Sequence, residues 1–132
     1  MTNEALSAEA TEFLRERHLA TLSSLRPDGS PHVVPVGFTW DAERRLARVI
    51  TDGGSVKARL AAGGGRVALC QVEGRRWLTL EGTSTVSADP ERVSEAVARY
   101  AERYRTPREN PTRVVIEITV DRVLGSSDLF PA

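Results

Sequence analysis

The chain has 132 residues, the length of one domain, so we expect residues 1–132 to share a single core. Its 18 basic and 18 acidic residues cancel, which excludes binding of nucleic acid or an anionic membrane through a strong overall charge. No apolar run approaches the ~20 residues of a membrane span, and the lone Cys70 cannot form an internal disulfide. We therefore expect a cytoplasmic protein without nucleic-acid or membrane partners.

Capping residues and the spacing of apolar residues predict the helices and strands. Ser7, Ser55 and Asp89 are suited to begin helices, because their side chains can accept hydrogen bonds from the first free amides. Apolar runs separated by short polar turns are typical of strands joined as hairpins. In chain order, we predict a helix over 8–17, strands over 18–25, 32–40 and 46–51, a helix over 56–62, strands over 66–72 and 76–86, a helix over 90–104 and a strand over 114–120.

Short turns between most of the predicted strands indicate an antiparallel sheet. The turn at residues 26–30, Arg-Pro-Asp-Gly-Ser, places a proline with a fixed φ before a glycine that tolerates a positive φ. Six strands in so short a chain favour closure into a small barrel, because closure removes exposed edges. We therefore predict a mainly β fold with flanking helices, built on a six-stranded antiparallel barrel.

The first candidate site is the segment 51–57, Thr-Asp-Gly-Gly-Ser-Val-Lys. It joins a strand to a helix start, and Lys57 is the only lysine beside 17 arginines. The amides of Gly54 and Ser55, the Ser55 hydroxyl and the Lys57 ammonium can together hold a phosphate. The spacing is not that of a P-loop. An ordinary capped turn is the alternative interpretation.

The second candidate site is the strand around residues 30–38, Ser-Pro-His-Val-Val-Pro-Val-Gly-Phe. Pro35 cannot donate a ladder hydrogen bond and Gly37 has no side chain, so a flat ring system can lie against this strand. A barrel strand with a proline bulge is the alternative, and His32 is more typical of a structural histidine than of a base. Two widely spaced histidines and one cysteine predict no metal site.

A third feature is the cluster of Arg103, Arg105 and Arg108 before the predicted last strand. Guanidinium groups close together can hold an anionic substrate or tail. An exposed loop without a binding role is the alternative.

Several strings of the chain resemble a known family. They are RHLATLSSLRPDGSPHVVPVGFTWD, ARVITDGGSVKA, RWLTLEG, RYAERYRTPRENPTRVVIEI and RVLGSSDL, in the same order from about Leu6 to Leu129. They resemble the pyridoxamine 5'-phosphate oxidase-like superfamily of flavin and deazaflavin proteins, and within it the biliverdin reductases that depend on coenzyme F420. The resemblance implies an FMN-binding-like split β-barrel.

The resemblance also implies a homodimer with active sites between the subunits and a tetrapyrrole substrate. The deazaflavin ring would lie along the strand formed by His32, Val33, Val34, Pro35 and Val36. The phosphate would bind to the loop formed by Gly53, Gly54, Ser55, Val56 and Lys57, and the coenzyme's poly-glutamate tail would pass near Arg108. Hydride would pass from reduced F420 to biliverdin and give bilirubin. No side chain is indicated as the general acid, so the catalytic residues remain unknown.

Two departures from relatives bear on the cofactor and the substrate. Val56 stands where flavin-using relatives often carry arginine, and the C-terminus lacks the Arg-x-His of true pyridoxamine 5'-phosphate oxidases. Two alternatives stay open. One is an FMN-binding reductase of quinones or nitro compounds, and the other is a non-catalytic protein that binds a coenzyme or a tetrapyrrole.

Overall fold

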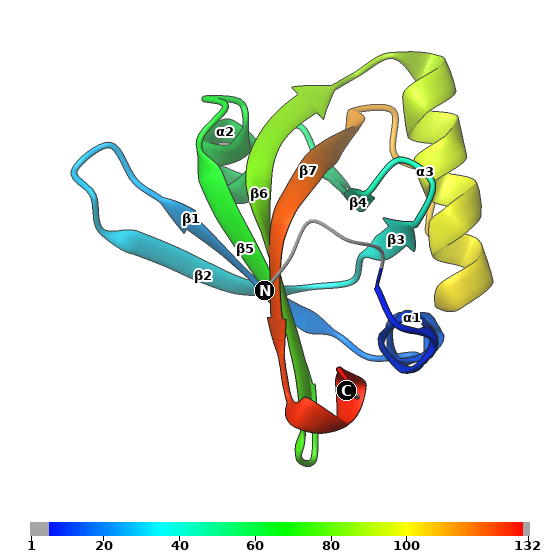
Figure 1. Cartoon of the computed structure of the whole chain (residues 1–132). Helices are drawn as coiled ribbons and strands as arrows, with labels where there is room; N and C mark the ends of the chain where they lie inside the picture. Colours follow the sequence, from blue (N-terminus) through cyan, green and yellow to red (C-terminus); the bar gives the residue numbers. More distant parts are fainter. Residues whose placement is uncertain (1–5, 131–132) are drawn as a thin grey trace.

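The computed structural model describes residues 6–130, which form one seven-stranded antiparallel sheet flanked by three α-helices (Figure 1). The strands lie in the order β2-β1-β5-β6-β7-β4-β3. Their bounds are β1 Ala20–Leu25, β2 Pro31–Val36, β3 Thr39–Asp41, β4 Leu46–Asp52, β5 Arg66–Glu73, β6 Arg76–Ser87 and β7 Arg113–Gly125. The helices are α1 Ala8–Arg15, α2 Val56–Ala61 and α3 Pro90–Arg103, and a 3-10 turn covers Ser127–Leu129.

The predicted strand over 32–40 is wrong as a single element, and the sheet has seven strands instead of six. The chain breaks at Gly37 and Phe38 into β2 and β3, which form the two opposite edges of the sheet. The ladder stops at these edges, so within the described residues the sheet does not close by hydrogen bonding. An antiparallel sheet that is split between β2 and β3 is compatible with the predicted split barrel.

The predicted helix starts are confirmed by their caps. The side chains of Ser7, Ser55 and Asp89 accept hydrogen bonds from the amides of the third residue after each. Each bond satisfies one of the amides that a helix start leaves without a partner. These three short-range interactions explain why the beginnings of α1, α2 and α3 could be predicted from local sequence.

The core lies inside the curved sheet and is closed by α1. The aromatic rings of Phe13 and Phe38 are fully buried, together with aliphatic residues such as Leu22, Leu80 and Ile116. In Figure 1 the hairpin of β1 and β2 projects on the side opposite to α3. Within residues 6–130, no helix is long and apolar enough to cross a membrane.

Glu16 and Arg76 join the end of α1 to the start of β6. The two Glu16 carboxylate oxygens accept hydrogen bonds from two Arg76 nitrogens, each at 2.9 Å, and His18 Nε2 lies 2.9 Å from Oε1. The bonds from Arg76 and His18 lower the pKa of Glu16 from 4.5 to about 2. This contact therefore stabilises the fold only while the carboxyl group is ionised.

We expect Glu16→Gln to destabilise the protein at neutral pH but not in acid. Because the pKa of Glu16 is lower in the folded state, its stabilising effect is complete above pH 4.5 and is lost as the pH falls toward 2. The difference in melting temperature between the wild type and Glu16→Gln should shrink over the same range. Thermal unfolding followed by circular dichroism at several pH values measures this difference. A difference that does not change with pH would contradict the assignment.

Candidate functional site

A cleft of about 290 Å³ brings both candidate sites of the sequence together. Its walls come from the ends of β2 and β4, the first turn of α2, the last turn of α3, the loop before β7 and the first residue of β7. Pro35 and Val36 of the predicted ring-binding strand lie on one wall, and Lys57 of the predicted phosphate loop lies on another. Residues that are 20 or more positions apart in the sequence thus face one space.

The remaining predicted residues do not lie on the wall of this cleft. His32, Val33 and Val34 lie farther along β2, toward the turn that joins it to β1. Val34 packs against the core, whereas Val33 is 54% exposed. Gly53, Gly54, Ser55 and Val56 are adjacent to the lining residues Asp52 and Lys57.

The amides proposed as phosphate donors already donate within the protein. Gly53 N donates to Thr112 O at 2.8 Å, Gly54 N to an Asp52 carboxylate oxygen at 2.8 Å, and Ser55 N to Asp52 O at 3.1 Å. The Ser55 hydroxyl accepts from Ala58 N at 3.2 Å. The loop is therefore internally hydrogen-bonded, and positive charge in the cleft comes from side chains.

Lys57 and Arg113 are the two cationic residues that line the cleft. No ion-pair partner within 4.0 Å is found for either of them among residues 6–130. The Arg113 guanidinium donates to Arg108 O at 2.6 Å and its backbone amide donates to Asn110 O at 3.2 Å, and both bonds hold the loop before β7. Two cations without an acidic partner can bind a phosphate or a carboxylate of a ligand.

Asp52 joins the loop before α2 to the loop before β7. Its carboxylate accepts hydrogen bonds from Gly54 N, from the Thr112 hydroxyl and, at 3.4 Å, from Asn110 Nδ2. The bonds from Thr112, Gly54 and Asn110 lower the pKa of Asp52. The two loops also meet at Gly53, where a Cβ atom would lie 3.1 Å from Thr112 O, so the close approach favours glycine.

The end of α3 fixes the crossover from β2 to β3. Gly37 lies against the rings of Tyr100 and Tyr104, and a Cβ atom there would lie 3.1 Å from each. The Tyr104 hydroxyl donates to His18 O at 2.6 Å and accepts from Phe38 N at 3.2 Å. Burial raises the pKa of Tyr104, which keeps the hydroxyl protonated as a donor.

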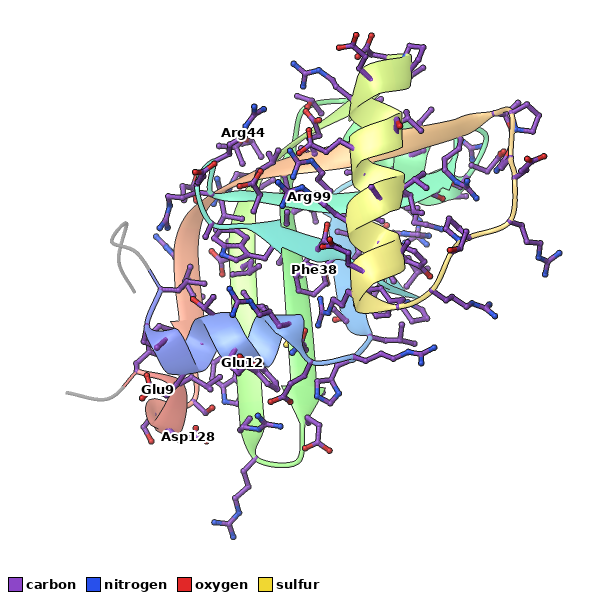
Figure 2. All side chains as sticks on the ribbon, turned by 90° about the vertical axis from the view of Figure 1, so that its right-hand side faces the viewer. Glu9, Glu12, Phe38, Arg44, Arg99 and Asp128 are labelled. Carbon is purple, nitrogen blue, oxygen red and sulfur yellow. The ribbon has the colours of Figure 1, made fainter. Side chains whose placement is uncertain are left out.

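Arg103 is turned inward and does not belong to an exposed basic cluster. It donates to Phe38 O at 2.6 Å, Gln71 Oε1 at 2.5 Å and Glu16 O at 2.9 Å, and its guanidinium lies over the Phe38 ring. Figure 2 shows Phe38 beside α3 and above α1. The basic cluster proposed for residues 103–108 is therefore wrong for Arg103, whereas Arg105 and Arg108 are exposed.

Sequence reasoning missed Tyr100, Asn110 and Arg113 as lining residues of the cleft. Tyr100 belongs to α3, and its ring packs against the Tyr104 ring with the centroids 4.9 Å apart. Asn110 and Arg113 lie on either side of Thr112 and carry no recognisable motif. Only their contacts with the loop before α2 place them at the site.

A larger cavity of about 540 Å³ lies between α1, β3 and α3, and Arg103 is the one residue of the three candidate features that lines it. Three arginines and three carboxylates line it, so its charges sum to zero, and Arg99 lies 3.3 Å from Asp41. Arg99 is labelled beside α3 in Figure 2. Because the charges of this cavity cancel, the smaller cleft, with two cations and one carboxylate, is the stronger candidate for an anionic cofactor.

Comparison with known proteins gives the family. The sequence model described as pyridoxamine 5'-phosphate oxidase matches residues 6–127. The chain belongs to the pyridoxamine 5'-phosphate oxidase family. It is also 58% identical over 129 residues to the F420H(2)-dependent biliverdin reductase of Mycobacterium tuberculosis (strain CDC 1551 / Oshkosh), covering 98% of this chain and 94% of that protein.

Solved structures show the same fold at low sequence identity. A conserved hypothetical protein from Mycobacterium tuberculosis superposes with a TM-score of 0.78 at 21% identity, covering 95% of this chain and 88% of that one. An F420 reductase superposes with a TM-score of 0.71 at 24% identity, covering 86% of this chain and 94% of that one. The predicted mainly β, antiparallel fold with flanking helices is confirmed, and the split-barrel prediction is compatible with it.

In this member of the pyridoxamine 5'-phosphate oxidase family, the cleft fits a flat cofactor with an anionic tail. Pro35 and Val36 present an apolar strand end, and the Tyr100 ring lies on the same cleft. Lys57 and Arg113 supply positive charge at the other walls. Stacking on apolar groups and charge-assisted hydrogen bonds are the interactions that such a cofactor needs.

Proposed function

We propose that the protein is an oxidoreductase that uses reduced coenzyme F420 to convert biliverdin to bilirubin. The observation that carries this proposal is the 58% identity, over 98% of the chain, to an F420H(2)-dependent biliverdin reductase. Identity at this level along nearly the whole chain extends through both segments that meet at the cleft. The donor set of the cleft, with two cations and an apolar strand end, supports the same cofactor.

In this proposal different walls of the cleft bind the ring and the phosphate of the cofactor. The deazaflavin ring lies along the end of β2, where Pro35 and Val36 line the cleft, and His32, Val33 and Val34 continue the same strand away from it. The segment of Gly53, Gly54, Ser55, Val56 and Lys57 lies at the phosphate, where Lys57 supplies the charge because the loop amides are already bonded. Arg113 adds a second cation from the start of β7.

The chemistry divides between the coenzyme, the solvent and the protein. When bound, reduced F420 supplies a hydride to the central methine carbon of biliverdin, and a proton from solvent completes bilirubin and balances the reaction. The protein holds two flat conjugated systems face to face, which lowers the entropic cost of the reaction. Tyr100 and Pro107 add an aromatic ring and an apolar ring to the lining of the cleft.

Anaerobic mixing of reduced F420 with biliverdin and the purified protein tests this function. We expect the absorbance of biliverdin to fall as the absorbance of oxidised F420 rises, in equal molar amounts. The same mixture without protein is the control. If both absorbances stay unchanged with the protein present, the proposed function is wrong.

We also propose a homodimer that forms through the outer face of β1, β2, β5 and β6. The exposed large apolar side chains of these strands and their ends lie on this face, and Val72 pairs directly with Trp77. Contiguous exposed apolar residues mark interaction surfaces. Pro35 pairs with Thr21 on the same face, so the cleft borders this surface. The apolar residues are Leu19, Leu25, Val33, Val72 and Trp77.

We expect Val72→Glu to convert the dimer to monomers. In a two-fold interface each substitution appears twice, so the variant places two like charges in an apolar contact. Ala42→Glu adds the same charge at an exposed position between β3 and β4 and should leave the dimer intact. Size-exclusion chromatography with light scattering measures the mass. If Val72→Glu remains a dimer, this face is not the interface.

A further inference from the structure

The cleft is not lined by positive charge alone, because one of its three charged residues is a carboxylate. Lys57 and Arg113 contribute two positive charges, and Asp52 contributes one negative charge on the same wall region. The cleft therefore presents about one net positive charge at neutral pH. A site without a carboxylate at this position would bind strongly charged anions more tightly.

The negative charge of Asp52 is fixed in place and is not cancelled by a salt bridge. Its hydrogen bonds come from neutral donors, namely Gly54 N, the Thr112 hydroxyl and Asn110 Nδ2. No cation lies within 4.0 Å of it among the residues that the structure describes. The same hydrogen bonds lower the pKa of Asp52, so the carboxylate is ionised wherever the protein is folded near neutral pH.

The two cofactors under consideration differ in charge at their phosphates. F420 joins its deazaflavin part to its tail through a phosphodiester, which carries one negative charge. FMN ends in a phosphomonoester, whose second pKa of ≈ 6 gives it about 1.5 to 2 negative charges at pH 7. A fixed carboxylate in the cleft therefore repels the phosphate of FMN about twice as strongly as that of F420.

We propose that Asp52 is a specificity-determining residue, which selects a phosphodiester and rejects a phosphomonoester at the Lys57–Arg113 cleft. The inference rests on the proposed function in one respect, the placement of the cofactor phosphate near Lys57. It adds to that function a physical reason for the choice between two cofactors of similar shape. Lys57 and Arg113 attract either phosphate, and Asp52 sets the difference between them.

Asp52 also holds two loops together, so its charge must be tested apart from that structural contact. Asp52→Asn removes the charge and retains a side-chain oxygen that can accept from Thr112. Thr112→Val removes the hydroxyl that donates to Asp52 and leaves the charge. Asp52→Glu keeps the charge and moves it by one methylene. The three variants separate the electrostatic effect from the loop contact.

Dissociation constants for F420 and FMN, measured by fluorescence titration without substrate, test the proposal. In Asp52→Asn the loss of one negative charge should lower the dissociation constant of F420 by about threefold and that of FMN by about tenfold. The effect on FMN is larger because doubling the charge of the phosphate doubles its interaction energy with the carboxylate. Riboflavin, which has no phosphate, should be unaffected. Thr112→Val and Asp52→Glu should leave the ratio of the FMN and F420 constants at its wild-type value.

The outcomes distinguish this proposal from the proposed function. If Asp52→Asn changes both constants by the same factor, or if Thr112→Val shifts their ratio as much, the selectivity role of Asp52 is wrong while F420 binding by the wild type stands. FMN binding that stays undetectable in Asp52→Asn also overturns it. A wild-type protein that does not bind F420 would overturn the proposed function as well.

Discussion

Replacing Arg103 with leucine is expected to lower the free energy of unfolding by about 3 kcal/mol. The guanidinium donates to three acceptors that belong to three separate segments, Phe38 O, Gln71 Oε1 and Glu16 O. Leucine removes these three bonds and the contact with the Phe38 ring, and it leaves the oxygen of the buried Gln71 side chain without the donor that Arg103 supplies. Phe38 O keeps the Tyr104 hydroxyl as a donor at 3.3 Å, and Glu16 O keeps His18 N at 3.0 Å. Burial lowers the pKa of Arg103, yet the group stays protonated at neutral pH and keeps all three bonds.

Urea denaturation measures the change at one fixed protein concentration, because the stability of the proposed homodimer would depend on concentration. The exposed Arg105→Leu is the matched control and should change the free energy of unfolding by less than about 0.5 kcal/mol. Arg103→Lys should fall between them, since an ammonium cannot donate to all three acceptors in the planar geometry of a guanidinium. If Arg103→Leu lowers the free energy of unfolding no more than Arg105→Leu does, the three hydrogen bonds do not contribute to stability.

The crossover that Arg103 holds is also where sequence reasoning failed. The run of apolar residues through Gly37 and Phe38 has the pattern of one long strand, and nothing local requires a break. The break depends on α3, because the rings of Tyr100 and Tyr104 lie against Gly37 and the Tyr104 hydroxyl bonds the Phe38 backbone. These contacts span more than 60 residues, which no local pattern reveals.

The helix starts were predictable for the opposite reason. Ser7, Ser55 and Asp89 each bond an amide only three residues away, so the determining interaction lies inside a short window of sequence. Hairpins such as β5–β6 are equally local, with Glu73 paired to Arg76 across the turn. Antiparallel pairing and the position of most strands followed from such turns.

The candidate site was predictable only in its separate parts. The glycine-rich loop and Lys57 stand out in the sequence, but the amide of Gly53 donates to Thr112, which lies 59 residues later. Asp52 was read as part of a turn, and its bonds to Asn110 and Thr112 span 58 and 60 residues. Sequence reasoning therefore found a plausible phosphate loop, and the structure indicates which of its groups remain available to a ligand.

The largest expected effect on binding comes from Lys57→Ala. We expect this substitution to weaken the binding of F420 by about 1–3 kcal/mol, because a charge-assisted contact to the phosphate is lost. This change raises the dissociation constant by about 5- to 150-fold. The loop amides cannot compensate, since Gly53, Gly54 and Ser55 already donate within the protein. Fluorescence titration of F420 measures the affinity, and an unchanged value would mean that the phosphate binds elsewhere.

Two controls decide whether the lysine acts by its charge and at the proposed place. Lys57→Arg keeps the charge and should retain most of the affinity, while a wild-type melting temperature in Lys57→Ala excludes damage to α2.

Arg113→Ala then provides a double-mutant cycle. If Lys57 and Arg113 hold the same phosphate across the cleft, removing either lets the phosphate shift toward the other, so their effects should not add. Strict additivity would place the two cations on different parts of the coenzyme, with Lys57 at the phosphate and Arg113 toward the tail.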